Sequence, residues 1–315
     1  MTKQEHWIDY CINNDNEICI FDKPFWLDAV SGGRKNWNVF LVEENGRIEA
    51  ALPFYQKKRR GLSYITMPPF TPCNGIWLRP VEQEKTEKRI NRENVFYKML
   101  IDQIEASGFS FYQQSFSPKV KNWQPFYWMG YEQKTLYTFC INHPYSLAEA
   151  EKNFSKSTRQ SLRRASQAYT ISELDDVVLF YKLHCMTYTR KNREAPFAFS
   201  LIQRIYKACK ENGAVKMLFM QDGEKNICST LLLVYDAKNV YSLMSGLSQE
   251  KRSNNIFGLL EYEGIKFACE TGRCYDFEGS MLEGVSKYNR GFGAEMYPYY
   301  GVRKVLTKTP ILRQY

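Results

Sequence analysis

The chain lacks the sequence features of several large protein classes. Its 315 residues contain no uninterrupted apolar run as long as a membrane-spanning helix, and the opening MTKQEHWIDYCINNDNE has no apolar stretch typical of a secretory signal. We therefore expect a soluble, cytoplasmic protein. The dinucleotide-binding fingerprint Gly-x-Gly-x-x-Gly and the phosphate-binding loop that ends in Gly-Lys-Ser/Thr are also missing. Their absence argues against the commonest nucleotide-dependent enzymes.

Histidines and paired cysteines are scarce as well. The chain has three histidines, and its nine cysteines include no C-x-x-C pair and no histidine partner at zinc-site spacing. We expect reduced cysteines and no bound metal. His184 has neither a nucleophile elbow nor an acidic partner in view, so we interpret it as a structural residue.

Positive charge is what the chain has in excess. Its 43 lysines and arginines against 34 aspartates and glutamates give a formal net charge of +9. This excess favours an anionic partner. The candidates are a small or nucleotide-linked substrate, a tRNA, and the head groups of a membrane surface to which the protein binds peripherally. At this length, with 44% hydrophobic residues, we expect an ordinary packed core in two domains or one large domain.

The order of the predicted elements repeats along the chain. Strand patterns at 37–44 and 47–58 flank the hairpin signal Asn45-Gly46, and a third strand pattern, a helix at 85–106, and two more strand patterns around a short helix follow. From residue 215 onward the same order recurs, with its long helix at 255–270. We predict two like domains, at 1–145 and 146–315.

Three further helices are predicted between the two sets of strands, at 147–167, 172–191 and 199–213. The first half has only a shortened counterpart, around PFWLDAVSGG. In the first of these helices Lys152, Lys156, Arg159 and Arg163 recur at spacings of 4, 3 and 4, which places them on one face. Such a face binds the phosphates of a nucleotide-linked acceptor, a tRNA or a lipid, or it is simply solvated.

Four segments carry a resemblance to a known family: SKSTRQSLRRA, RSNNIFGLLEYEGIKFA, YDFEGS and YNRGFGA. The second half resembles the Gcn5-related N-acetyltransferase (GNAT) fold, and the chain from about residue 20 to 303 resembles the bacterial FemAB-like proteins, which are two such domains in tandem. The resemblance implies a mixed α/β fold class, a tandem duplicated GNAT-like acyl-CoA N-acyltransferase fold. It also implies an acyl-CoA or acetyl-CoA donor.

In this family the pyrophosphate of the donor lies at the start of the helix predicted here at 255–270, where free backbone N–H groups suit phosphate oxygens. The donor-binding candidates are therefore the residues before and at that start, with the preceding strand next to the acyl carbonyl: Ser245, Gly246, Arg252, Ser253, Asn254 and Gly258. Gly246 is interpreted as allowing close approach of the donor. The loop has one glycine, Gly258, where the family usually has two.

Asp276 and Glu278 lie two residues apart on one predicted strand, so their side chains share a face. If that face meets the cleft, one of them is the candidate catalytic base; otherwise both are solvated charges. Tyr288 is the candidate acid for the leaving group, with a packed aromatic as the alternative. Asn289 stands where the family has a lysine, so we name Arg290 beside it as a substrate-binding candidate.

The remaining substrate-binding candidates are Lys156, Arg159 and Arg163 on the basic helix face and Phe70 in the proline-rich segment TMPPFTPCNGIW. We expect that segment to form one wall of an acceptor site at the domain interface; the alternative is a rigid loop that only connects two elements.

The function expected from the resemblance is acyl transfer from acyl-CoA to an amine, with a cell-envelope precursor as acceptor. One alternative is an aminoacyl-tRNA-dependent peptidyl transferase of the Fem type, against which Asn289 and the absence of a long coiled-coil insertion argue. The other is a binding protein that kept the fold without the chemistry.

Overall fold

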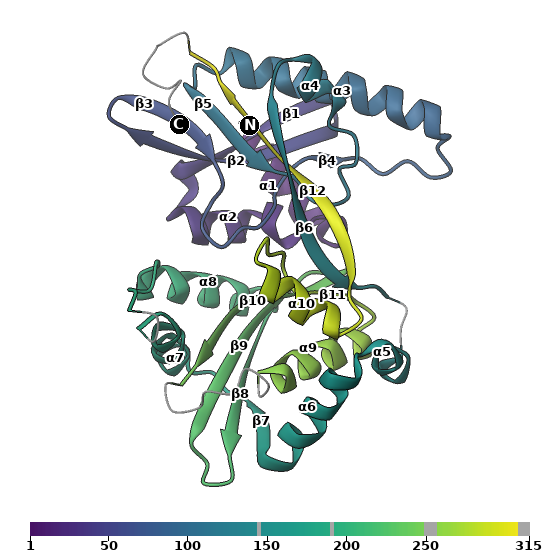
Figure 1. Cartoon of the computed structure of the whole chain (residues 1–315). Coiled ribbons are helices and arrows are strands. Elements are labelled where there is room, and N and C mark those ends of the chain that lie inside the picture. The colour runs from purple at the N-terminus through teal and green to yellow at the C-terminus, as the bar shows by residue number, and fades with distance from the viewer. Residues whose placement is uncertain (144–145, 190–191, 249–256, 308–315) are drawn as a thin grey trace. The chain divides into compact units, whose positions relative to one another are not determined.

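The computed structural model describes residues 1–143, 146–189, 192–248 and 257–307. The chain divides into two compact units (Figure 1). Unit 1 holds residues 1–136 together with the C-terminal segment from Pro298 onward, and unit 2 holds Tyr137–Tyr297.

Unit 1 consists of strands with parallel and antiparallel neighbours and of helices that precede and separate these strands. Its strands follow the order β1-β2-β3-β5-β12, and β4 pairs with β2. The strand bounds are β1 Trp37–Glu44, β2 Arg47–Arg59, β3 Leu62–Thr66, β4 Trp77–Leu78, β5 Phe111–Ser115 and β12 Glu295–Val305. The helices are α1 Lys3–Asn13, α2 Pro24–Ser31, α3 Thr86–Ala106 and α4 Gln124–Trp128, with short 3-10 turns at Asp15–Glu17, Ile20–Asp22 and Arg34–Asn36.

The sequence patterns of unit 1 produce most of these elements. Asn45 and Gly46 both have positive φ, 51° and 74°, as the tight hairpin between β1 and β2 requires, so this prediction is confirmed. Helix α3 buries Phe96, Leu100 and Ile104 at helical spacing against the sheet core.

Two helices precede the strands of unit 1, so the prediction of a single shortened one was wrong. The missed helix, α1, starts with a capping box in which the Thr2 hydroxyl accepts from the Glu5 N–H and the Glu5 carboxylate accepts from the Thr2 N–H. Two helices, α1 and α2, therefore precede the strand meander of unit 1.

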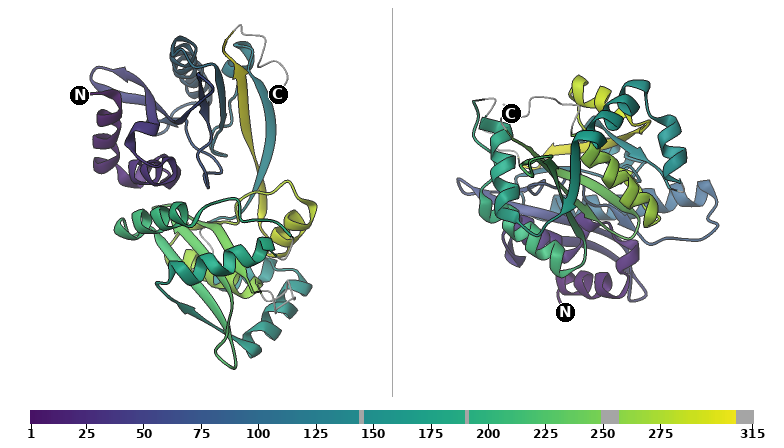
Figure 2. Two further views of the ribbon diagram at one scale, coloured as in Figure 1. Left: turned by 90° about the vertical axis from the view of Figure 1, so that its left-hand side faces the viewer. Right: turned by 90° about the horizontal axis from the view of Figure 1, so that it is seen from below.

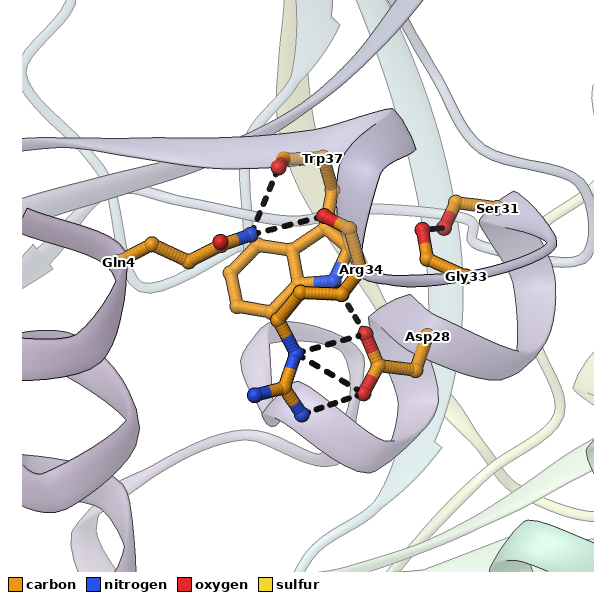
Figure 3. Close-up of polar contacts among 6 residues, drawn as sticks. All are labelled: Gln4, Asp28, Ser31, Gly33, Arg34 and Trp37. Atoms are coloured by element: carbon orange, nitrogen blue, oxygen red, sulfur yellow. Dashed lines mark hydrogen bonds and ion pairs between the residues drawn. The ribbon is translucent and has the colours of Figure 1, made fainter. Parts of the chain in front are cut away.

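A polar cluster ties α1, α2 and β1 together at one edge of unit 1 (Figure 3). The Asp28 carboxylate accepts from the Trp37 indole Nε1 at 2.6 Å and from the Arg34 guanidinium Nη2 at 2.6 Å. The Gln4 amide donates to the carbonyls of Arg34 and Trp37 at 3.0 and 2.8 Å. Because Trp37 is 1% exposed, its indole N–H depends on Asp28 for a partner.

Replacing Asp28 therefore separates a buried hydrogen bond from an exposed ion pair. We expect Asp28→Ala to lower the free energy of unfolding by about 1–3 kcal/mol, because the Trp37 N–H loses its acceptor. Asp28→Asn keeps an acceptor oxygen and loses only the ion pair with the half-exposed Arg34, so we expect a loss of about 0–1 kcal/mol. Urea unfolding followed by circular dichroism measures both, and equal effects of the two variants would contradict this account.

The sheet strands of unit 2 follow the order β6-β11-β10-β9-β8-β7, with parallel and antiparallel neighbours. The strand bounds are β6 Glu132–Ile141, β7 Tyr169–Glu173, β8 Val215–Asp222, β9 Ile227–Tyr235, β10 Asn239–Leu247 and β11 Cys274–Asp276. The helices are α5 Leu147–Asn153, α6 Lys156–Ala168, α7 Val177–Thr189, α8 Phe199–Glu211, α9 Gly258–Glu270 and α10 Glu283–Gly291.

The helices of unit 2 cover both faces of its sheet (Figures 1 and 2). Helices α6 and α9 pack on one face over a core that includes Leu231, Leu247 and Leu260, and we call this the α9 face. Helices α7 and α8 lie on the other, here called the α7 face. The meander β8-β9-β10, helix α9 and strand β11 confirm the predicted order.

The predicted helix at 147–167 was wrong in one respect, because it is two helices. Phe154 and Ser155 interrupt it, with Ser155 in extended conformation as the N-cap of α6, where its hydroxyl accepts from the Thr158 N–H at 3.1 Å. Lys152 consequently lies on α5 and is no part of the α6 face. Strand β7, which follows α6 directly, was not predicted.

The last strand of each half pairs outside its own half. Residues 140 and 141 of β6 pair with β11 in unit 2, while Gly301–Val305 of β12 pair with β5 in unit 1. The compact units therefore differ from the expected division at 145 and 146 by these two strand segments.

Candidate functional site

The sheet of unit 2 opens between two neighbouring strands. β10 and β11 are parallel and pair only over Asn239–Tyr241 and Cys274–Asp276. β10 then continues to Leu247 with β9 as its partner, after a register shift between Ser242 and Met244. A bulge increases local twist, so it turns the second part of β10 away from β11.

A cavity of about 830 Å³ lies on the α9 face at the start of α9. Its walls come from α6, α9, α10 and the residues that flank them: Ser155, Ser157, Thr158, Ser161, Leu162, Gly258, Gly284, Lys287, Tyr288, Arg290, Gly291 and Phe292. Five hydroxyl groups and two cationic side chains thus meet the free N–H groups of two helix starts. Such a surface suits the oxygens of an anion.

Tyr288 brings an unpaired hydroxyl to this cavity. The phenol oxygen is buried and has no hydrogen-bond partner among the residues that the structure describes. A Cβ at Gly258 would lie 3.7 Å from this oxygen and 3.4 Å from the Phe292 ring, at ordinary contact distance, so the start of α9 lies directly beside both side chains. Burial, and then the nearby Glu261, raise the pKa of Tyr288 well above its usual value, so the hydroxyl keeps its proton.

A second buried acid, Glu261, joins α9 to the point where the strands part. Its carboxylate accepts from the Ser242 hydroxyl on β10 at 3.0 Å and from the Tyr275 hydroxyl on β11. Gly264 makes room for this contact, since a Cβ there would lie 2.7 Å from the Tyr275 ring. Burial raises the pKa of Glu261 to about 7, although both hydrogen bonds act to lower it.

Asp276 is the last residue of β11, and Glu278 follows it in a turn, so the prediction that both residues lie on one strand was wrong for Glu278. Tyr275 lies in the core of the α9 face, so Asp276, its neighbour on the strand, lies on the α7 face, opposite the cavity. The catalytic roles of Asp276 and Glu278 stay a prediction. The Thr138 hydroxyl donates to Asp276 Oδ1 at 2.5 Å, and the Glu278 N–H donates to the same oxygen at 2.9 Å.

The turn after Asp276 fixes the backbone conformation of Glu278 and partly buries its side chain. Glu278 has a φ of 57°, and a Cβ at Gly279 would lie 1.9 Å from the Tyr137 carbonyl oxygen, so only glycine fits. Glu278 Oε1 is buried and has no hydrogen-bond partner within the described ranges of the chain. Burial raises the pKa of both carboxyl groups, and the charge of Asp276 adds to the rise at Glu278.

The packing of helix α7 explains why residue 246 is a glycine, whereas the sequence suggested close approach of the donor. A Cβ at this position would lie 2.5 Å from the His184 backbone nitrogen, so helix α7 packs directly onto the strand there. The Ser245 carbonyl accepts from the His184 ring. The packing of α7 thus gives a reason for glycine at position 246, and the roles of Ser245 and Gly246 in donor binding stay a prediction.

The basic face of α6 lies outside the cavity. Lys156 and Arg163 are exposed and do not line it. Arg159 donates to the carbonyls of Glu151, Lys152 and Phe154, which end helix α5. This contact gives Arg159 a capping role.

Of the other candidates, Arg290 and Gly258 line the cavity. Arg252, Ser253 and Asn254 lie outside the described residues. Phe70, in unit 1, has positive φ in the segment where the neighbouring Thr71 accepts from the Trp26 indole at 3.0 Å. Its role in an acceptor site stays a prediction, as do the roles of Lys156 and Arg163.

Residues 152–290 match the model of a family described as acetyltransferase (GNAT) domain. The chain carries a GNAT domain. This domain contains both the cavity and the opening between β10 and β11. No curated protein matches the chain in sequence.

Solved structures extend the likeness from the GNAT domain to the whole chain. The crystal structure of FemX has a TM-score of 0.71 at 15% identity, covering 95% of this chain and 96% of that one. A tandem GNAT protein from the clavulanic acid biosynthesis pathway has a TM-score of 0.55 at 8% identity, covering 98% and 96%. L-PGS from Bacillus licheniformis has a TM-score of 0.54 at 10% identity, covering 85% and 83%. The predicted fold class and the FemAB-like resemblance in fold are confirmed.

Two negative findings apply to the described residues of the GNAT domain and of the rest of the chain. No helix among them is both long and apolar enough to cross a membrane. In the same residues no three histidine, cysteine or acidic side chains are grouped so that they could hold a metal ion.

Sequence reasoning missed several residues of the GNAT domain site. The hydroxyl groups of Ser155, Thr158 and Ser161 and the ammonium group of Lys287 line the cavity, yet the sequence singled out the charged residues of α6 instead. The N-cap pattern at Ser155 was the available signal, because a cap there starts a new helix and turns these hydroxyls together. Glu261 had no signal, since its burial depends on the packing of α9.

Glu261 should make the protein less stable as the pH rises. A carboxyl group whose pKa rises from 4.5 to about 7 on folding stabilises the fold below pH 4.5 and loses that contribution as the pH passes 7. The loss amounts to about 3 kcal/mol. We therefore expect Glu261→Gln, which does not titrate, to gain stability relative to the parent chain between pH 5 and 8. Urea unfolding at both pH values measures this, and a pH-independent difference would show that Glu261 titrates normally.

Proposed function

We propose that the GNAT domain transfers an acyl group from a coenzyme A thioester to an amine. The observation that carries this proposal is the cavity at the start of α9, where hydroxyl groups, helix starts and two cations converge beside the opening of the sheet. Its volume of about 830 Å³ is within the range of small-molecule sites. A cell-envelope precursor is the acceptor that we propose, on the fold likeness to FemX.

The donor-binding side of the reaction rests on charge. Lys287 and Arg290 bind phosphate oxygens of the donor, and the Ser155, Thr158 and Ser161 hydroxyls donate to the same group. The acyl end then reaches the opening between β10 and β11, where strand N–H groups polarise the carbonyl. Tyr288, protonated in its buried position, donates its proton to the leaving sulfur.

The acceptor approaches from the α7 face, because Asp276 lies there with Glu278 hydrogen-bonded to it. An alkylammonium group must lose a proton before it can attack. Asp276 and Glu278 attract it by charge, and their raised pKa values make them stronger bases than an exposed carboxylate, once deprotonated. The activity should therefore fall with decreasing pH as this pair becomes protonated.

An aminoacyl-tRNA donor is the second candidate, and the surface of α6 favours it. Lys156, Arg163 and Arg164 are exposed next to the cavity wall and could follow a nucleic-acid backbone. A tRNA would bind largely outside the cavity, whereas coenzyme A would bind inside it. The two donors can thus be separated by where charge is removed.

Two double variants with the same charge change make this separation. We expect coenzyme A and acetyl-coenzyme A at about 100 times the dissociation constant to stabilise the parent chain by about 2.7 kcal/mol, seen as a shift in melting temperature. Lys287→Ala with Arg290→Ala should abolish the shift, and Arg163→Ala with Arg164→Ala should keep it. The reverse pattern, with charged tRNA binding lost in the second variant only, would favour the tRNA donor. Absence of a shift with any thioester would contradict the proposal.

Tyr288 gives a separate test of chemistry after binding. Tyr288→Phe keeps the ring and removes the hydroxyl, so the coenzyme A shift should persist. The rate of thiol release from acetyl-coenzyme A in the presence of primary amines should fall by about 100-fold, the usual effect of losing a general acid. An unchanged rate would exclude Tyr288 as the acid.

A further inference from the structure

His184 on helix α7 is a buried histidine with a fixed tautomer. Its side chain is 5% exposed, and its Nδ1 lies 2.8 Å from the Ser245 carbonyl oxygen on β10. A carbonyl oxygen only accepts hydrogen bonds, so Nδ1 carries the hydrogen and Nε2 keeps a lone pair.

The helix holds this ring rigidly against the second part of β10. The backbone around Leu183 and His184 touches Gly246 so closely that no Cβ fits there. One turn further along, the Leu247 N–H donates to the Thr187 hydroxyl at 3.1 Å. Ser245 and Leu247 direct these groups to the edge of β10 that points away from β9, where β11 no longer pairs. The imidazole therefore lies at the opening of the sheet.

Nε2 of this ring has no hydrogen-bond partner in the described part of the chain, although it is buried. Its surroundings are aromatic, with the Phe180 ring stacked at 6.1 Å between centroids and the Tyr188 ring edge-on at 5.2 Å. A buried acceptor without a donor is unfavourable, and such an atom is typical of a position that a ligand completes. The bond to Ser245 alone is sufficient to hold the ring in place, so it gives no reason for a free lone pair on Nε2.

We propose that His184 Nε2 accepts the proton that the attacking amine loses to form the amide. The inference rests on the proposed acyl transfer. His184 lies on the α7 face, as does Asp276, and β10 and β11 are neighbours, so both residues lie on the acceptor's side of the opening.

The steps balance when the two bases act in sequence. The acidic pair takes the first proton from the ammonium group, and the free amine forms a bond to the carbonyl carbon of the thioester. His184 Nε2 takes the second proton from that nitrogen, the carbon–sulfur bond breaks, and the sulfur receives the Tyr288 proton. The products are an amide and a thiol. The acidic pair and His184 then release their protons to the solvent, and Tyr288 regains one, so that one proton is released in each cycle.

The protonation state of the ring fits this role. Burial lowers the pKa of His184 below its usual value, and the hydrogen bond to the Ser245 carbonyl opposes this only partly. The groups that face the ring are the Ser245 carbonyl from β10 and the Phe180 and Tyr188 rings from α7, none of them charged. The ring is thus neutral at neutral pH and able to accept a proton.

Nitrogen NMR of the labelled full-length protein tests the ring first. The chain has three histidines, so comparison with His184→Asn assigns the signal. We expect the Nδ1–H tautomer, unprotonated at Nε2, at pH 7. An Nε2–H tautomer or a doubly protonated ring would overturn the inference.

Turnover then tests the role. His184→Asn places an amide N–H near the position of Nδ1, so it keeps the bond to Ser245 and removes the proton acceptor. With acetyl-coenzyme A and hydroxylamine as probes, we expect a normal donor thermal shift, a loss of turnover of about 100-fold, and loss of the acidic limb that belongs to His184 in the pH profile. Thr187→Val weakens the attachment of α7 without touching the ring, and its profile should keep the parent shape.

The outcomes separate two failures. If His184→Asn turns over at the parent rate with the parent pH profile, His184 is structural and the inference is wrong. If the parent chain neither binds a thioester nor forms an acyl product, the proposed function fails and this inference fails with it.

Discussion

The parting of β10 from β11 is the constraint on which the site depends. Parallel neighbours that pair over only three residues each leave a strand edge with unused backbone groups inside the GNAT domain. Helix α7 satisfies two of these groups through His184 and Thr187. On the other face α9 begins at Gly258 and leaves its first N–H groups toward the cavity. A donor on one face and an acceptor on the other can therefore meet at one opening.

Loss of solvent around this opening raises the pKa values of its acidic residues. Glu261, Asp276 and Glu278 are all held where burial raises the carboxyl pKa. Glu261 is fully paired by Ser242 and Tyr275, which suits a residue that joins a helix to the sheet. Among the described residues, Glu278 Oε1 has no hydrogen-bond partner, and the turn that holds Glu278 requires glycine at position 279. An unpaired carboxylate oxygen of this kind suits the binding of a cationic ligand.

The sequence predicts those features that local physics determines. The Asn45-Gly46 hairpin and the helical spacing of α3 follow from turn geometry and periodicity alone. Features that arise from packing were missed or misread. Gly246 reflects the contact with α7, and the unpaired Nε2 of His184 depends on a carbonyl 61 residues away. The pairing of β6 and β12 outside their own halves is equally invisible to a local pattern.

The location of bound coenzyme A tests the central claim most directly. A crystal structure of the chain grown with coenzyme A should show its phosphates among Ser155, Lys287 and Arg290, with the thiol directed toward the opening between β10 and β11. A ligand bound elsewhere, with this cavity left free at saturating concentration, would contradict the account.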